Sequence, residues 1–103
     1  MNDKYILDGK TPIPCEDIMK WGEFMEEKDA KRVAFHKEAG IEVSTVFLGL
    51  DHGHRQRTPI LFETMIFHGE HDGYQERYET WEQAEAGHIV ACKKAGLLKW
   101  LIE

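Results

Sequence analysis

His52 and His54, two histidines near the middle of the chain, have the spacing of half a metal site. They belong to the segment Asp51-His52-Gly53-His54, and on an extended backbone residues two apart point to the same side. Two imidazoles beside a carboxylate are ligands that zinc and other divalent transition metals accept. A complete site needs further ligands, and the alternative interpretation is a polar turn that contains histidines.

Three further candidate ligands, His68, His71 and Asp72, follow the next apolar run. If that run returns as an antiparallel strand, they lie about 20 Å from His52, at ~3.3 Å per residue. One joint site is therefore not expected. We predict no metal and no cofactor, and in particular no stoichiometric zinc or manganese.

Glu63 differs from the other carboxylates because it interrupts an apolar strand pattern that includes Leu61, Met65 and Phe67. A carboxylate in such a place either faces solvent or is paired with a cation. We expect an exposed strand face, and pairing with an arginine is the alternative. The candidate partners are Arg32, Arg55, Arg57 and Arg77. A buried, perturbed carboxylate would instead indicate catalysis, so Glu63 and His52 are the candidate catalytic residues.

Two cysteines and one further histidine offer nucleophilic chemistry only in outline. Cys15 stands at the expected start of a helix, where the helix N-terminus would lower the pKa of its thiol. The sequence supplies no partner base, so a small buried residue is the simpler interpretation. Glu85, His88 and Cys92 recur at helical spacing on one face that also contains alanines. We interpret this face as packed, with the histidine hydrogen-bonded to a neighbouring backbone group or carboxylate.

The strands that position these residues are expected where β-branched and aromatic residues are dense. They are residues 4–7, 32–37, 41–50 and 60–67. The last two flank the histidine turn as a central hairpin, and Glu38-Ala39-Gly40 connects the second strand to the third. Residues 68–77 contain two glycines and are expected to be a loop.

Two helices complete the expected fold. Residues 15–28 repeat apolar side chains at spacings of three and four. Thr80 and Gln83 fit a capping box that begins the second helix, and Gly96 is placed to end it. The sequence thus predicts a single α+β domain over residues 1–103, in the order β-α-β-β-β-α. A small antiparallel sheet of about four strands would carry both helices on one face.

The composition excludes several functional classes. A net charge of −6 disfavours general nucleic-acid binding, which needs a basic face. No apolar run approaches the ~20 residues of a membrane span, and charged residues interrupt the N-terminus where a signal peptide would be apolar. With two cysteines expected to be free thiols, we predict a cytoplasmic protein without membrane contact.

Five sequence blocks resemble a family of small phage and prophage proteins that also occur as bacterial hypothetical proteins. The blocks are YILDGKTPIPCEDIMKW, KRVA, VSTVFLGLDH, PILFETMIF and RYETWEQAEAGH, and they cover most of the chain. The resemblance implies no activity, cofactor or catalytic residue. It implies a context, the cytoplasm of a bacterial host, in which small phage accessory proteins often act by binding.

Three hypotheses about function follow. The first is a non-enzymatic accessory protein that binds a host or phage protein, or a small ligand, for instance in counter-defence. Its candidate binding residues are Asp51, His52, Arg55, Arg57 and Glu63. The second is a small metal-dependent hydrolase centred on Asp51, His52 and Glu63. The third is a minor virion or assembly component.

The C-terminal tail, residues 97–103, is apolar enough to require a cover. We expect a homodimer, because a second copy is the commonest source of such a surface. The expected interface residues are Leu98, Trp100 and Ile102. The alternative is a tail that folds back on its own domain.

Overall fold

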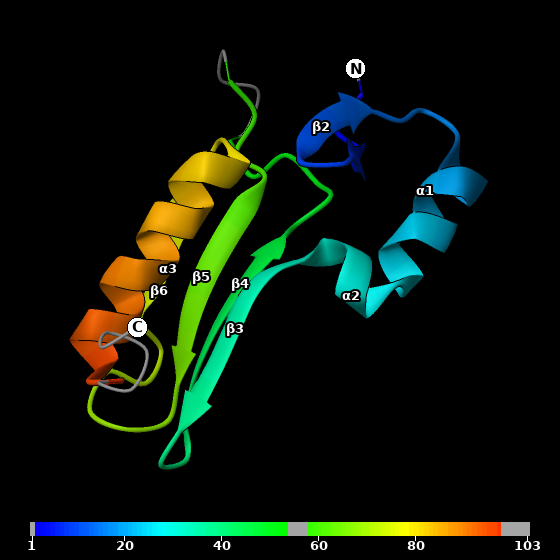
Figure 1. Ribbon diagram of the computed structural model, residues 1–103. Coiled ribbons are helices and arrows are strands. Elements are labelled where there is room, and N and C mark those ends of the chain that lie inside the picture. Colours follow the sequence, from blue (N-terminus) through cyan, green and yellow to red (C-terminus); the bar gives the residue numbers. More distant parts are fainter. Residues whose placement is uncertain (1, 54–57, 98–103) are drawn as a thin grey trace.

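The computed structural model describes residues 2–53 and 58–97 as nine elements of mixed type (Figure 1). They are β1 (Tyr5–Asp8), β2 (Thr11–Pro14), α1 (Ile18–Glu26), α2 (Lys28–Lys31), β3 (Arg32–Glu38), β4 (Ile41–Phe47), β5 (Phe62–Phe67), β6 (Gln75–Tyr78) and α3 (Trp81–Ala95). The α+β class is confirmed. None of the helices in the described part of the chain has the length and apolarity that a membrane crossing requires.

The main sheet is an antiparallel meander in the order β3-β4-β5-β6. Its first turn has two residues, Ala39 and Gly40, both with positive φ (53° and 82°), which is the conformation that matches the twist of paired strands. The sequence predicted three connecting residues, but Glu38 is still in β3 and pairs with Ile41.

Burial alternates from Val43 to Phe47 in β4 and along β5, so the sheet has two different faces. Val43, Thr45 and Phe47 of β4 are buried, and each lies opposite a buried partner on β5: Ile66, Thr64 and Phe62. α3 covers this face and contacts all four strands (Figure 1). The residues that alternate with these buried ones point to the opposite face of the sheet. None of the helices in the described ranges packs along the whole of that opposite face.

α3 begins and ends where the sequence predicted. Thr80 accepts a hydrogen bond from the backbone N–H of Gln83, and the Gln83 side chain completes the capping box. Gly96 follows the last turn in the left-handed conformation, with φ of 79°. The buried residues of the helix are Ala84, His88, Ala91 and Cys92. Their small average size lets α3 lie close to the strands.

The N-terminal strand was predicted to join the main sheet, but in the structure it does not. β1 and β2 pair with each other in a separate two-stranded sheet, because the turn at Gly9-Lys10 folds β2 back and satisfies the backbone of β1 locally. The unit is attached to the end of the main sheet through Gly49, whose carbonyl accepts hydrogen bonds from Tyr5 N (2.9 Å) and Trp21 Nε1 (3.0 Å).

The first helix is shorter than predicted and lies beside one end of the sheet (Figure 1). Asp17 is its N-cap, since the Asp17 carboxylate accepts from the backbone N–H groups of Met19 and Lys20. Cys15 therefore precedes the helix. Phe24 packs edge-on against Phe47, with ring centroids 6.0 Å apart, so α1 reaches the core at the end of the sheet.

Three of the four residues of β6 lie within the segment that was predicted to be a loop, residues 68–77. Its sequence, QERY, has no apolar alternation that would mark a strand. The strand is held by pairing with β5, in which Arg77 lies opposite Glu63 and Tyr78 opposite Phe62. A polar edge strand of this kind is specified by its neighbour rather than by its own composition.

The packing of α3 against β6 predicts opposite effects of one substitution at two helical glycines. A Cβ added at Gly87 would come within 2.1 Å of the Tyr78 hydroxyl oxygen, whereas one added at Gly22 in α1 meets nothing within 4 Å. Gly87→Ala should therefore destabilise the fold by about 1–3 kcal/mol through overpacking. Gly22→Ala should stabilise it by roughly 0.5–1 kcal/mol through helix propensity. Urea denaturation measures both, and equal effects would contradict the close contact at Gly87.

Candidate functional site

His88 is the most deeply buried titratable histidine among the described residues, at 1% exposure. It lies one turn after Ala84 and one turn before Cys92 on the face of α3 that meets the sheet. Because the neighbouring alanines are small, the imidazole can reach the strands. Its ring nitrogens therefore need partners from the sheet.

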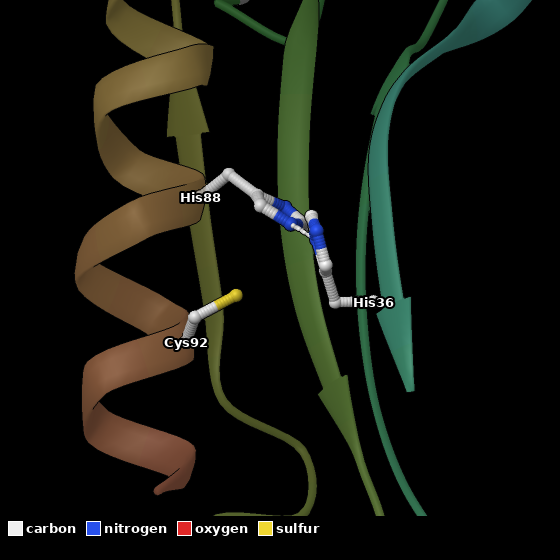
Figure 2. A group of neighbouring side chains, drawn as sticks. All are labelled: His36, His88 and Cys92. Carbon is white, nitrogen blue, oxygen red and sulfur yellow. Dashed lines mark hydrogen bonds between the residues drawn. The ribbon is translucent and has the colours of Figure 1, made fainter. Parts of the chain in front are cut away.

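Both nitrogens of His88 have such partners. The Nδ1 atom lies 2.7 Å from Thr45 Oγ1 on β4, and Thr45 Oγ1 lies 2.5 Å from Thr64 Oγ1 on β5. The Nε2 atom lies 2.8 Å from His36 Nδ1 on β3. Figure 2 shows the two histidine rings facing each other. The four side chains form a continuous hydrogen-bonded chain from Thr64 to His36. It spans three strands and the helix.

His36 is placed in this chain by strand register. It lies opposite Val43, and Ala34 lies opposite Thr45, so both β3 residues share the face that α3 covers. His36 is only partly exposed. The sequence interpretation paired His88 with a backbone group or a carboxylate, but the partners are Thr45 and His36. The pairing of His88 with His36 depends on the register of β3 on β4, which local sequence patterns do not specify.

Cys92 adds a third potential ligand to the histidine pair. It is fully buried, and its Sγ lies in a group with one ring nitrogen each of His36 and His88 in which all atoms are within 4.8 Å of one another. Figure 2 shows the three side chains converging between α3 and the strands. Within residues 2–53 and 58–97, this is the group of histidine, cysteine and carboxylate side chains that could hold a metal ion.

Burial sets the charge state of the group. Desolvation, reinforced by His36, lowers the pKa of His88 to about 4, and desolvation raises the pKa of the Cys92 thiol to about 11. In the metal-free protein at neutral pH, His88 is therefore neutral and Cys92 is a thiol rather than a nucleophilic thiolate. Glu85, the third member of the spacing seen in sequence, is exposed and is not part of the group.

Asp51 and His52 lie in the connection between β4 and β5. The Asp51 carboxylate accepts hydrogen bonds from the backbone N–H groups of Gly53 (2.7 Å) and Ile60 (2.9 Å), which closes the two ends of the loop. The backbone N–H of His52 donates to the Ile60 carbonyl oxygen at 2.9 Å. His54, Arg55 and Arg57 lie outside the described residues. Asp51 therefore stabilises this loop by accepting backbone hydrogen bonds from both of its ends.

Glu63 lies on the face of the sheet opposite α3. Its carboxylate accepts hydrogen bonds from Arg77 Nε at 3.0 Å and Gln75 Nε2 at 2.7 Å. The Glu63 side chain is 13% exposed, so the arginine pairing considered from sequence is present and Arg77 is the partner. Asp51, His52 and Glu63 form no cluster of potential metal ligands within the described ranges.

The remaining sequence candidates lie apart from this site. His68 and His71 line a pocket of about 240 Å³ near the end of α3. The backbone N–H of His68 donates to the Asp72 carboxylate within the loop. Cys15 is buried, with its Sγ 3.5 Å from the carbonyl oxygen of Asp17. The proposed interface residues Leu98, Trp100 and Ile102 lie outside the described residues.

No protein-family model, curated protein or solved structure matches this chain.

The burial of His88 predicts how the metal-free protein responds to acid. The ring of His88 should stay neutral from pH 7 to pH 5 and gain its proton near pH 4, whereas in the unfolded chain it gains it near pH 6.5. Because the unfolded state then binds more protons, stability is lost as pH falls from about 6.5 towards 4, by roughly 3 kcal/mol.

Histidine NMR resonances of the chelator-treated protein measure this titration directly. As a control, the loss of stability between pH 7 and pH 4 should be smaller in His88→Gln than in the wild type. A His88 midpoint near 6.5 would contradict the burial of the ring.

Proposed function

We propose that the protein is a small accessory protein of the phage type, which acts by binding another protein rather than by catalysis. The observation that carries the proposal is the one-sided covering of the main sheet. We call the opposite side the open sheet face and define it by Phe35, Val46, Glu63, Met65, Phe67 and Arg77. Strand register puts these residues on one surface across β3, β4, β5 and β6.

The open sheet face has the composition of a protein interface. Phe67 is 39% exposed, and Phe35, Val46 and Met65 are partly exposed. The ion pair between Glu63 and Arg77 lies beside them. Aromatic and methionine side chains next to an arginine are enriched in protein interfaces.

A cluster of three cations adjoins this face. Lys28, Lys31 and Arg32 line a pocket of about 220 Å³ together with Val46 and Phe47. Arg32 also stacks on Phe35, with its guanidinium carbon 4.7 Å from the ring centroid. In a chain of net charge −6, this basic corner favours a partner that presents carboxylates beside an apolar patch.

The shape of the surface favours a protein over a small ligand. Two pockets lined by described residues, of about 220 and 240 Å³, are each smaller than the ~300–1,000 Å³ of typical small-molecule sites. A broad sheet surface with an apolar centre suits an extended partner surface. We therefore propose a protein partner with an acidic, partly apolar binding patch. The homodimer expected from the tail stays a separate prediction.

Two substitutions on the proposed surface and one matched control test the proposal. Phe67→Glu removes an apolar contact, and Lys28→Glu reverses a charge of the basic corner. Val90→Glu introduces the same charge on the outer side of α3, where Val90 is 57% exposed. Immobilised variants are incubated with lysate of a bacterial host, and the bound proteins are quantified by mass spectrometry after circular dichroism has confirmed folding.

A protein retained by the wild type and by Val90→Glu should bind Phe67→Glu about tenfold more weakly, the effect of ~1.4 kcal/mol. Lys28→Glu should also weaken it. Retention that is equal in all variants would contradict the proposal. So would light scattering that shows a wild-type dimer dissociated by Phe67→Glu, because the open sheet face would then bind a second copy of this chain.

A further inference from the structure

The buried group on the other side of the sheet points to a second property, which does not depend on the proposed function. We propose that His36, His88 and Cys92 bind one divalent transition-metal ion of the zinc class at the interface between α3 and β3. The proposed ligand atoms are Cys92 Sγ and the facing nitrogens His36 Nδ1 and His88 Nε2, which are 2.8 Å apart. One potential ligand atom from each of the three residues lies within 4.8 Å of the other two. None of the described turn histidines takes part.

The residue types select the class of ion. Two imidazole nitrogens and one sulfur suit zinc and chemically similar ions, whereas magnesium and calcium require oxygen ligands. His88 and Cys92 are four residues apart on α3, so they lie on the same side of the helix. His36 faces them from β3 (Figure 2). The ion would therefore connect the helix to an edge strand of the sheet.

The three ligand atoms have to adjust their separations to hold an ion. The facing nitrogens of His36 and His88 are 2.8 Å apart, and two nitrogens at ~2.0–2.1 Å from a tetrahedral zinc ion are separated by about 3.3 Å. The sulfur lies within 4.8 Å of the other ligand atoms and would move to about 3.5 Å from the nitrogens, the separation that a Zn–S bond of ~2.3 Å sets. Changes of up to about 1 Å are within reach of rotation about the side-chain bonds. A fourth ligand would come from solvent on the partly exposed side of His36.

The supporting hydrogen bonds are already in place. A histidine that binds metal through one nitrogen usually donates the N–H of the other to a fixed acceptor. Thr45 Oγ1, 2.7 Å from His88 Nδ1, is such an acceptor, and Thr45 can direct its own hydroxyl proton to Thr64. This arrangement leaves the lone pair of His88 Nε2 directed at His36 and the ion.

Binding has a defined proton balance. The Cys92 thiol must lose its proton to form the sulfur–metal bond, and that proton passes to solvent. His88 is neutral at pH 7 and contributes its Nε2 lone pair without losing a proton. In the metal-free protein His36 Nδ1 carries the proton of the hydrogen bond to that lone pair. On binding, His36 gives this proton up at Nδ1 and takes one from solvent at Nε2, so the two histidines release no net proton. The metal-free alternative is a hydrogen bond between the two imidazoles with Cys92 as an apolar neighbour.

The expectation of no metal came from ligands in the turns. The histidines His52, His54, His68 and His71 fall in two separate turns, and the two cysteines were expected on different helices. His36 was not among the expected ligands. That histidine lies 52 residues from His88 in sequence, and strand register brings the two together. The proposed site thus differs from every metal site considered from sequence.

The test uses purified full-length protein without a histidine tag. After chelation and dialysis, we expect one cobalt ion per chain to bind, with the absorption band of a thiolate-to-cobalt bond. Zinc should displace the cobalt and raise the melting temperature, as ligands of the native state do. Cys92→Ala and His36→Gln should each lower the zinc affinity at least tenfold.

Cys15→Ala is the matched control, because Cys15 is the other buried cysteine and lies outside the group. It should leave the cobalt band and the stoichiometry unchanged. If Cys92→Ala fails to fold, the wild-type cobalt spectrum and the His36→Gln variant still test the site. His36 is partly exposed on an edge strand, so its substitution is expected to leave the fold intact. Absence of the thiolate band in the wild type, or metal binding unaffected by His36→Gln, would overturn the proposal.

Discussion

The hydrogen bond between His88 and Thr45 fixes the position of α3 on the sheet. It joins two buried side chains at 2.7 Å. A hydrogen bond of this kind contributes only about 1 kcal/mol net, but leaving a buried polar atom without a partner costs about 1–3 kcal/mol. Sliding the helix by one turn would place Ala84 or Cys92 opposite Thr45, so the polar contact selects one register.

That register of α3 determines both features to which a function is assigned, the open sheet face and the buried group of His36, His88 and Cys92. With α3 fixed over one face, its small residues cover the buried side chains of β4 and β5, and the other face keeps Phe67 and Met65 outside this core. The same register brings His88 against His36 and places Cys92 one turn further on. The open sheet face and the buried ligand group are therefore two results of one packing arrangement.

Sequence reasoning succeeded where the signal is local. The capping box at Thr80, the helix end at Gly96 and the runs of β-branched and aromatic residues in β4 and β5 depend on residues within a few positions of one another. It failed where pairing partners decide the structure. β6 is polar and is held by β5, and His36 acquires its role only through its register opposite Val43. Neither pairing can be inferred from hydropathy.

The most direct test of this account is a long-range ¹H–¹⁵N correlation spectrum of the histidine rings, recorded before and after one equivalent of zinc. The account predicts metal-bound shifts at His36 Nδ1 and His88 Nε2, with a proton retained on His88 Nδ1 beside Thr45. Unchanged spectra of these two rings, or zinc shifts confined to His52, His68 or His71, would contradict it.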